Sequence, residues 1–184
     1  DGQSDFGDVF DKNGTQWQDT DGDGFGDNWG DSSWNQSRAS NWPGQYVAGA
    51  FKPDPSPLDY DNDGFSDSAF GGDGPFDDCV LMYGTSDVDQ YGCPDADGDG
   101  WSDLGDLIPN DPTQWVDGDG DGYGDNQDGN NADAFVDEAS QWSDIDGDGY
   151  GDNQEAWAYE PDGCIYDAGN STADRLGCID SDSD

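Results

Sequence analysis

Apolar residues lie singly along most of the chain, between runs of aspartate and glycine, and they give no extended helical or strand periodicity. Asp-Gly and Gly-Asp steps interrupt helices and strands alike, so we expect sparse regular secondary structure and a chain made mostly of turns. Short helices are predicted only over 132–142 and 153–160. Residues 29–58 differ from the rest, because three tryptophans, a short apolar run and several prolines predict a hairpin followed by an extended connector.

Aspartate loops recur along the chain. The pattern D-x-D-x-D-G-aromatic-x-D occurs five times, and repetition of this kind indicates a repeat architecture. The five copies begin at Asp19, Asp59, Asp95, Asp117 and Asp144.

Two longer matches group these loops. Residues 59–99 match 144–184 without a gap, and residues 1–28 match 99–126. Residues 29–58 lie outside both matches, so we interpret them as an insertion whose tryptophans pack locally or, alternatively, form a surface for a partner. The predicted segments are 1–28 with a half loop and the first loop, the insertion 29–58, 59–143 with the first cysteine pair, and 144–184 with the second cysteine pair and a terminal half loop.

The charge of the chain is extreme. Its 184 residues include 45 acidic and 4 basic ones, a formal net charge of -41, and only 30% are hydrophobic. This composition resembles a disordered acidic chain, because self-repulsion and little apolar area oppose folding. If the chain folds, a basic partner or multivalent cations must neutralise it, and nucleic-acid binding is disfavoured. Almost all the acids are aspartate, whose short side chain suits tight loops that aim carboxylates inward.

The spacing within each loop is that of a calcium site. Calcium takes about six to eight oxygen ligands, and its twelve-residue loop uses side chains at positions 1, 3, 5, 9 and 12, the carbonyl at 7 and a glycine at 6. Every copy has aspartate at 1, 3, 5 and 9, glycine at 6 and an aromatic residue at 7, whose ring is left to pack between loops. Magnesium rarely uses all-protein cages, and transition metals favour His or Cys, whereas the chain has no His.

Position 12 carries an acid in three of the loops, at Asp106, Asp128 and Glu155. The first two loops lack this acid, so we expect them to use a later carboxylate or to bind more weakly. The remaining predicted ligands, by side chain or by the carbonyl at position 7, are Asp19, Asp21, Asp23, Phe25, Asp27, Asp59, Asp61, Asp63, Phe65, Asp67, Asp95, Asp97, Asp99, Trp101, Asp103, Asp117, Asp119, Asp121, Tyr123, Asp125, Asp144, Asp146, Asp148, Tyr150 and Asp152.

These loops resemble the thrombospondin type 3 repeat, whose pattern is D-x-D-x-D-G-x-x-D-x-x-D, often beside Cys-Pro. The third loop fits through Asp106 and follows Cys93-Pro94, and the fourth fits through Asp128. The resemblance implies a chain wrapped around calcium ions, with disulfides, little regular secondary structure and more than one ion per motif. The D-G-D-G-Y-G-D-N units also resemble tandem arrays of microbial surface proteins. The fifth loop, with Glu155 at position 12, resembles an EF-hand or dockerin loop as an alternative.

The cysteines and sequons predict an extracellular or cell-surface location. Four cysteines allow three pairings, and the equal spacing favours Cys79–Cys93 and Cys164–Cys178 over a zinc site, which would need C-x-x-C pairs or His. Disulfides imply an oxidising compartment, and no apolar run is long enough to span a membrane. The sequons, which make glycans expected partners, begin at Asn13, Asn35 and Asn170.

Each end of the sequence carries half of a loop. Asp180, Asp182 and Asp184 match positions 1, 3 and 5, whereas Asp1, Asp5 and Asp8 match positions 5, 9 and 12. One copy could therefore complete a calcium site with the next, a heterologous contact that builds an open filament. The alternative is a fragment of a longer tandem array.

We therefore predict a calcium-binding structural repeat protein, which forms a head-to-tail, calcium-cemented filament or surface fibre with itself. The alternative is a calcium-rigidified spacer or a dockerin- or adhesin-like binding module. Catalysis is not expected, because the chain has no His and no nucleophile beside a base.

Overall fold

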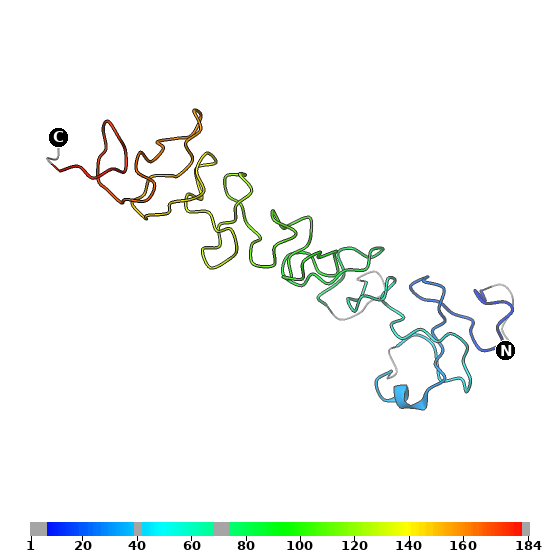
Figure 1. Ribbon diagram of the computed structural model, residues 1–184. Helices are drawn as coiled ribbons and strands as arrows, with labels where there is room; N and C mark the ends of the chain where they lie inside the picture. Colours follow the sequence, from blue (N-terminus) through cyan, green and yellow to red (C-terminus); the bar gives the residue numbers. More distant parts are fainter. Residues whose placement is uncertain (1–6, 39–41, 68–73, 182–184) are drawn as a thin grey trace. The chain divides into compact units, whose positions relative to one another are not determined.

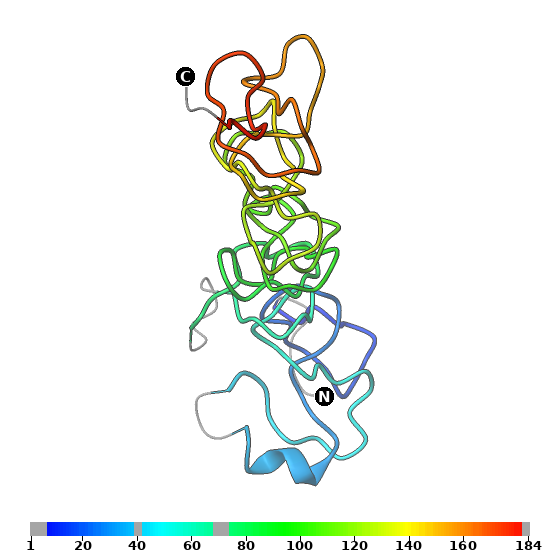
Figure 2. The same cartoon turned by 60° about the vertical axis from the view of Figure 1, so that its left-hand side comes forward.

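The computed structural model describes residues 7–38, 42–67 and 74–181. Within these residues the only helix is the 3-10 helix η1 (Ser32–Asn35), and strand pairing is confined to isolated bridges (Figures 1 and 2). The prediction of an irregular fold with two disulfides is therefore confirmed. None of the described residues belongs to a helix that is long and apolar enough to cross a membrane.

The short helices predicted over 132–142 and 153–160 are wrong, because neither segment contains a helix and both consist of turns, bends and irregular backbone. In the first segment, side chains take the backbone N–H groups that a helix would use. The Asp133 carboxylate accepts from Phe135 N–H at 2.7 Å, and Glu138 accepts from both the N–H and the hydroxyl of Ser140. Local bonds of this kind compete with helix formation.

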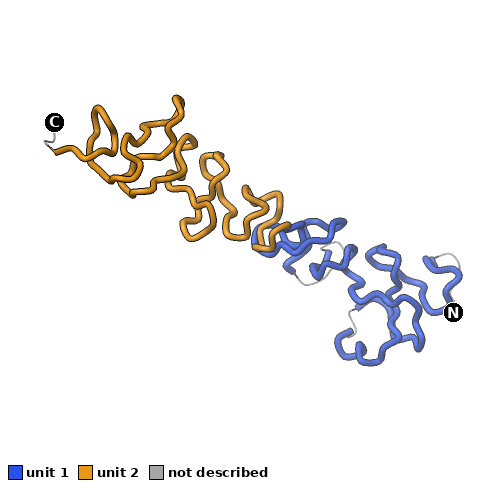
Figure 3. The backbone as a smooth tube through the Cα atoms, in the orientation of Figure 1, with its two compact units in different colours: residues 1–95 blue, residues 96–184 orange. Residues whose placement is uncertain are grey.

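The chain divides into two compact units, residues 1–95 and residues 96–184 (Figure 3). The division falls inside the third aspartate loop, between Asp95 and Ala96. It is coarser than the four segments expected from the sequence, and that finer division stays a prediction.

Isolated parallel bridges return the chain to four of the five loops. In each case the residue at loop position 8 pairs with a residue further along the chain, which brings a distant segment against the loop. These pairs are Gly26 with Pro53, Ser66 with Phe76, Gly124 with Ala132 and Gly151 with Pro161. Each bridge delivers the next residue, an aspartate in all four cases, to the side of its loop.

In three loops, a buried glutamine that precedes the loop hydrogen-bonds the backbone of the asparagine at position 10. Gln114 is 1% exposed, accepts from Asn126 N–H at 2.9 Å and donates to the Asn126 carbonyl at 2.9 Å. Gln16 and Gln141 bond Asn28 and Asn153 in the same way. A Cβ at Gly124 would lie 2.1 Å from the Gln114 Oε1 atom, which explains the glycine at position 8 of this loop.

The apolar core is small. Among the described residues, the buried hydrophobic ones are Trp29, Cys93 and Cys178, whereas many large apolar side chains are exposed. The prediction that rings pack between loops is confirmed where Tyr123 stacks on Trp142, with ring centroids 5.2 Å apart. Much of the interior consists instead of carboxylates and amides, which need polar or ionic partners when they are buried.

The predicted disulfides, Cys79–Cys93 and Cys164–Cys178, are both formed. Each closes a small ring of the same design, in which Gly84 or Gly169 lies against the second cysteine. A Cβ at either glycine would lie 2.0 Å from the carbonyl carbon of that cysteine.

The hairpin predicted within the insertion 29–58 is wrong. The bridge between Trp29 and Tyr46 is parallel rather than antiparallel, and η1 lies between these two residues. The Asp31 side chain accepts from Ser33 N–H at the start of η1, which fixes the turn that leaves Trp29.

Candidate metal centres

Five aspartate triplets could hold metal ions. In each triplet, one carboxylate oxygen from positions 1, 3 and 5 lies within 4.8 Å of the others. All fifteen side chains are buried or half-buried. The triplets are Asp19, Asp21 and Asp23; Asp59, Asp61 and Asp63; Asp95, Asp97 and Asp99; Asp117, Asp119 and Asp121; and Asp144, Asp146 and Asp148.

The aspartate at position 1 shapes the turn that makes the carboxylates converge. In the fourth loop, Asp117 accepts from Gly120 N–H at 2.7 Å and from Gly122 N–H at 2.9 Å, one bond for each oxygen. Both glycines have positive φ, at 83° and 94°, which explains the D-G-D-G sequence. Asp19, Asp59 and Asp144 make the same pair of bonds in their loops.

Positions 5 and 9 fix the rest of each loop. The position 5 carboxylate accepts from the N–H of the aromatic residue at position 7, as Asp121 does from Tyr123 at 2.9 Å. The position 9 carboxylate accepts from the N–H of position 2, as Asp125 does from Gly118 at 3.1 Å. The same two bonds recur in the other four loops. That the position 7 carbonyl binds an ion stays a prediction.

A further buried aspartate, which sequence reasoning missed, accompanies four of the loops. We call these residues the distal carboxylates: Asp54, Asp77, Asp133 and Asp162, which are 0%, 6%, 0% and 1% exposed. Each follows the bridge residue described above, and its N–H donates to the carbonyl of loop position 8 at 2.8–3.1 Å. The backbone bridge therefore sets the place of the carboxylate.

The two oxygens of each distal carboxylate differ. The Oδ1 atom accepts from the N–H two residues later, at 2.6–2.8 Å. The Oδ2 atom is buried and has no hydrogen-bond partner among the described residues. A buried carboxylate oxygen without a donor is costly. Among the described residues no group donates to these Oδ2 atoms, and at Asp54 the guanidinium of Arg38 supplies only a nearby positive charge.

Electrostatic coupling shows what surrounds these oxygens. Burial, with the nearby charges of Asp21 and Asp23, raises the pKa of Asp54 to about 7. Burial together with Asp121 and Asp119 likewise raises the pKa of Asp133 to about 6. Each distal carboxylate is therefore beside the triplet of its own loop.

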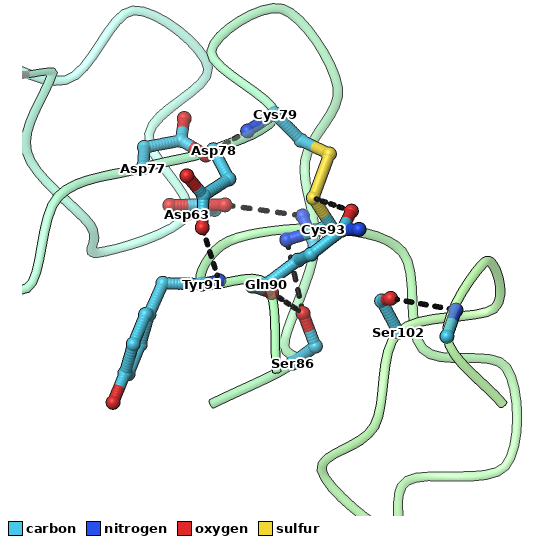
Figure 4. The surroundings of a disulfide bond; sticks show 11 residues. Asp63, Asp77, Asp78, Cys79, Ser86, Gln90, Tyr91, Cys93 and Ser102 are labelled. Atoms are coloured by element: carbon cyan, nitrogen blue, oxygen red, sulfur yellow. Dashed lines mark hydrogen bonds between the residues drawn. A yellow bond between two sulfur atoms is a disulfide. The ribbon is translucent and has the colours of Figure 1, made fainter. Parts of the chain in front are cut away.

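The second and fifth loops show the same arrangement. Burial, with Asp63 as the strongest charged neighbour, raises the pKa of Asp77 to about 6. Figure 4 shows Asp63 and Asp77 beside the Cys79–Cys93 disulfide, where Asp63 accepts from Gly84 N–H at 3.2 Å. In the fifth loop, burial, Asp148 and Asp162 raise the pKa of Asp146.

In the third loop the aspartate at position 12 makes the same backbone and Oδ1 hydrogen bonds as the distal carboxylates. Asp106 at position 12 is 6% exposed, its N–H donates to the Ser102 carbonyl at 2.8 Å, and its Oδ1 accepts from Ile108 N–H at 2.7 Å. In the fourth and fifth loops the structure instead leaves position 12, Asp128 and Glu155, exposed. Asp133 and Asp162 take the buried place there.

The remaining candidate residues are only partly described. Asp1, Asp5, Asp182 and Asp184 of the split loop lie outside the described residues, so head-to-tail assembly stays a prediction. Asp8 accepts from Phe10 N–H at 2.8 Å, the same local bond that Asp106 makes.

The three sequon asparagines use their side chains as acceptors. Asn13 accepts from the Thr15 hydroxyl at 2.8 Å, Asn35 from Trp29 Nε1–H at 2.6 Å, and Asn170 from Asp180 N–H at 3.4 Å. Their glycosylation stays a prediction.

No protein-family model matches the chain, and no curated protein sequence matches it. The resemblance to calcium-binding repeats therefore depends on the motif and on the geometry above. What the structure establishes is an irregular, disulfide-stapled chain with repeated aspartate triplets that could bind metal ions.

Proposed function

We propose that the protein is an extracellular calcium-binding structural protein, similar to thrombospondin type 3 arrays, in which bound ions take the place of an apolar core. The observation that carries this proposal is the distal carboxylate. In four loops the distal carboxylate has a buried Oδ2 atom without a hydrogen-bond donor, and this atom lies beside three converging aspartates. A bound cation removes the desolvation and repulsion that this arrangement otherwise carries.

The second loop illustrates the charge that must be neutralised. Asp59, Asp61, Asp63, Asp67 and Asp77 all interact electrostatically, and burial followed by Asp63 and Asp77 raises the pKa of Asp61 to about 7. No lysine or arginine of the described residues lies among the main charges that shift the pKa values of Asp59, Asp61, Asp67 and Asp77. The charge of this site is therefore left to an external cation, and the convergence of the carboxylate oxygens favours a bound metal ion over a basic partner.

The donor chemistry favours calcium. The candidate ligands are carboxylate oxygens on irregular turns, which suit the high coordination number and tolerant geometry of calcium. The chain has no His, and all four cysteines are in disulfides, so the usual ligands of zinc and copper are missing. The disulfides also fit an oxidising, extracellular compartment.

Calcium binding is tested by counting ions on the purified, oxidised chain. Isothermal titration with calcium, checked by native mass spectrometry, should give at least one ion for each of the five triplets. Magnesium at the same concentration should bind more weakly, because it demands octahedral geometry. Fewer ions than loops, or equal affinity for magnesium, would contradict the proposal.

A further inference from the structure

Arg38 is a buried cation in the insertion 29–58, which the aspartate loops do not explain. Its side chain is 6% exposed, and its guanidinium lies over three tryptophan rings: Trp29 at 5.4 Å, Trp34 at 4.5 Å and Trp42 at 5.5 Å from their centroids. Cation–π contacts of a desolvated arginine are stabilising and orient the guanidinium plane. We call this group the arginine–tryptophan cage.

The cage is joined directly to the first loop. The Arg38 Nη2–H group donates to the main-chain carbonyl of Asp54, the distal carboxylate of that loop. Asp54 N–H donates in turn to the Gly26 carbonyl at 2.9 Å. Asp54 is therefore held by its backbone from two sides, while its buried Oδ2 atom remains without a hydrogen-bond partner.

The first loop depends more than the others on a contact that holds its distal carboxylate in place. The connection from its position 9 to its distal carboxylate runs over residues 28–53, whereas the corresponding connections of the fourth and fifth loops run over 126–132 and 153–161. Closing a longer connection costs more entropy. The contacts of the cage lie within the described part of this connection and oppose that cost.

We propose that Arg38 is a positioning residue for the first metal site: the arginine–tryptophan cage places Asp54, and thereby lets the first triplet bind calcium with a fourth carboxylate. Arg38 is not a ligand, because its hydrogen bond goes to the carbonyl of Asp54 and leaves the carboxylate for the ion. This inference rests on the proposed calcium binding. It assigns to the insertion a role in closing that site.

The test compares Arg38→Met with Arg175→Met in the oxidised full chain. Arg175 is a matched control, because its Nη2–H also donates to a carbonyl beside a distal carboxylate, that of Gly163, at 2.7 Å, but its side chain is exposed. Arg38→Met should lower the affinity for one of the bound calcium ions about ten- to a hundredfold, the range for losing a charge-assisted hydrogen bond. Arg175→Met should leave every ion close to wild-type affinity.

Two further variants separate positioning from a general structural role. Arg38→Lys keeps a cation over the rings and one donor for the carbonyl, so it should recover most of the lost affinity. Asp54→Asn should lower the affinity for the same calcium ion. The double variant with Arg38→Met should lose little more affinity than either single variant, because both residues act on one site.

The outcomes are distinguishable from failure of the calcium proposal. A wild-type chain that binds no calcium would overturn the proposed function itself. If the wild-type chain binds its ions but Arg38→Met binds all of them with unchanged affinity, the positioning role is wrong. It is also wrong if Arg38→Met weakens all sites equally, or if the effects of Arg38→Met and Asp54→Asn simply add.

Discussion

Replacing Asp133 by asparagine should change the stability of the ion-free protein and its calcium affinity in opposite directions. Burial, together with Asp121, Asp119 and Asp125, raises the pKa of Asp133 from 3.8 to about 6. At a pH well above 6 the ionised side chain therefore costs the ion-free fold about 3 kcal/mol relative to the unfolded chain. Asp133→Asn removes this cost, so the variant should be up to about 3 kcal/mol more stable in chelator.

With calcium the sign reverses. The buried Oδ2 atom of Asp133 has no hydrogen-bond partner, and a cation there gains a charged ligand that asparagine cannot supply. Loss of this charge should lower the affinity for one calcium ion about ten- to a hundredfold. The matched control is Asp128→Asn, which removes the same charge at the exposed position 12 of the same loop. This control should change neither the stability in chelator nor the calcium affinity.

Urea denaturation with excess chelator and again with saturating calcium measures both effects, and calorimetric titration of the three proteins gives the affinities. The reasoning is refuted if Asp128→Asn weakens calcium binding while Asp133→Asn does not, since position 12 would then be the ligand. It is also refuted if Asp133→Asn lowers stability in chelator, because the buried charge would then have a partner in the ion-free fold.

Further predictions concern pH, the buried glutamines and the disulfides. Burial raises the pKa of Asp54 and Asp61 to about 7, so the ion-free fold binds more protons than the unfolded chain and gains stability as pH falls from about 7 to about 4. Small-angle scattering in chelator should accordingly show compaction over this range, while calcium affinity falls as protons compete for the carboxylates. Gln114→Ala leaves the Asn126 N–H without its acceptor and should lower the free energy of unfolding by about 1–3 kcal/mol in urea with calcium present. Replacing Cys79 and Cys93 by serine should cost about 3 kcal/mol in the same assay, the value for a loop of this length.

The triplets and disulfides could be predicted from the sequence because their information is local. Gly120 and Gly122 take positive φ, so that the spacing alone brings Asp117, Asp119 and Asp121 together. The equal spacing of the two cysteine pairs indicated their pairing for the same reason.

The distal carboxylates could not be found in this way. Asp54, Asp77 and Asp133 follow their loops after connections of different length, and only the backbone bridges show that they are equivalent. Asp54 and Asp162 each follow a proline, whereas Asp77 follows Phe76 and Asp133 follows Ala132. The distal carboxylates therefore share no common dipeptide. Asp128 and Glu155 were predicted as ligands from the twelve-residue pattern. Only in the third loop is the acid at position 12, Asp106, buried.

The helix prediction over 132–142 failed because side chains in this segment compete for the backbone N–H groups that a helix would use. Asp133 and Glu138 each accept from an N–H two residues later, which stabilises turns. The buried glutamines were missed because amides at Gln16 and Gln114 are isolated in sequence, although Thr-Gln-Trp recurs before both loops.

The most direct test is an experimental structure with calcium, in which anomalous scattering locates the ions. The account predicts an ion at each aspartate triplet, with Asp133 and Asp162 among the ligands and Asp128 and Glu155 outside the coordination shell. Ions bound by Asp128 and Glu155 in place of the distal carboxylates, or triplets without ions at saturating calcium, would contradict it.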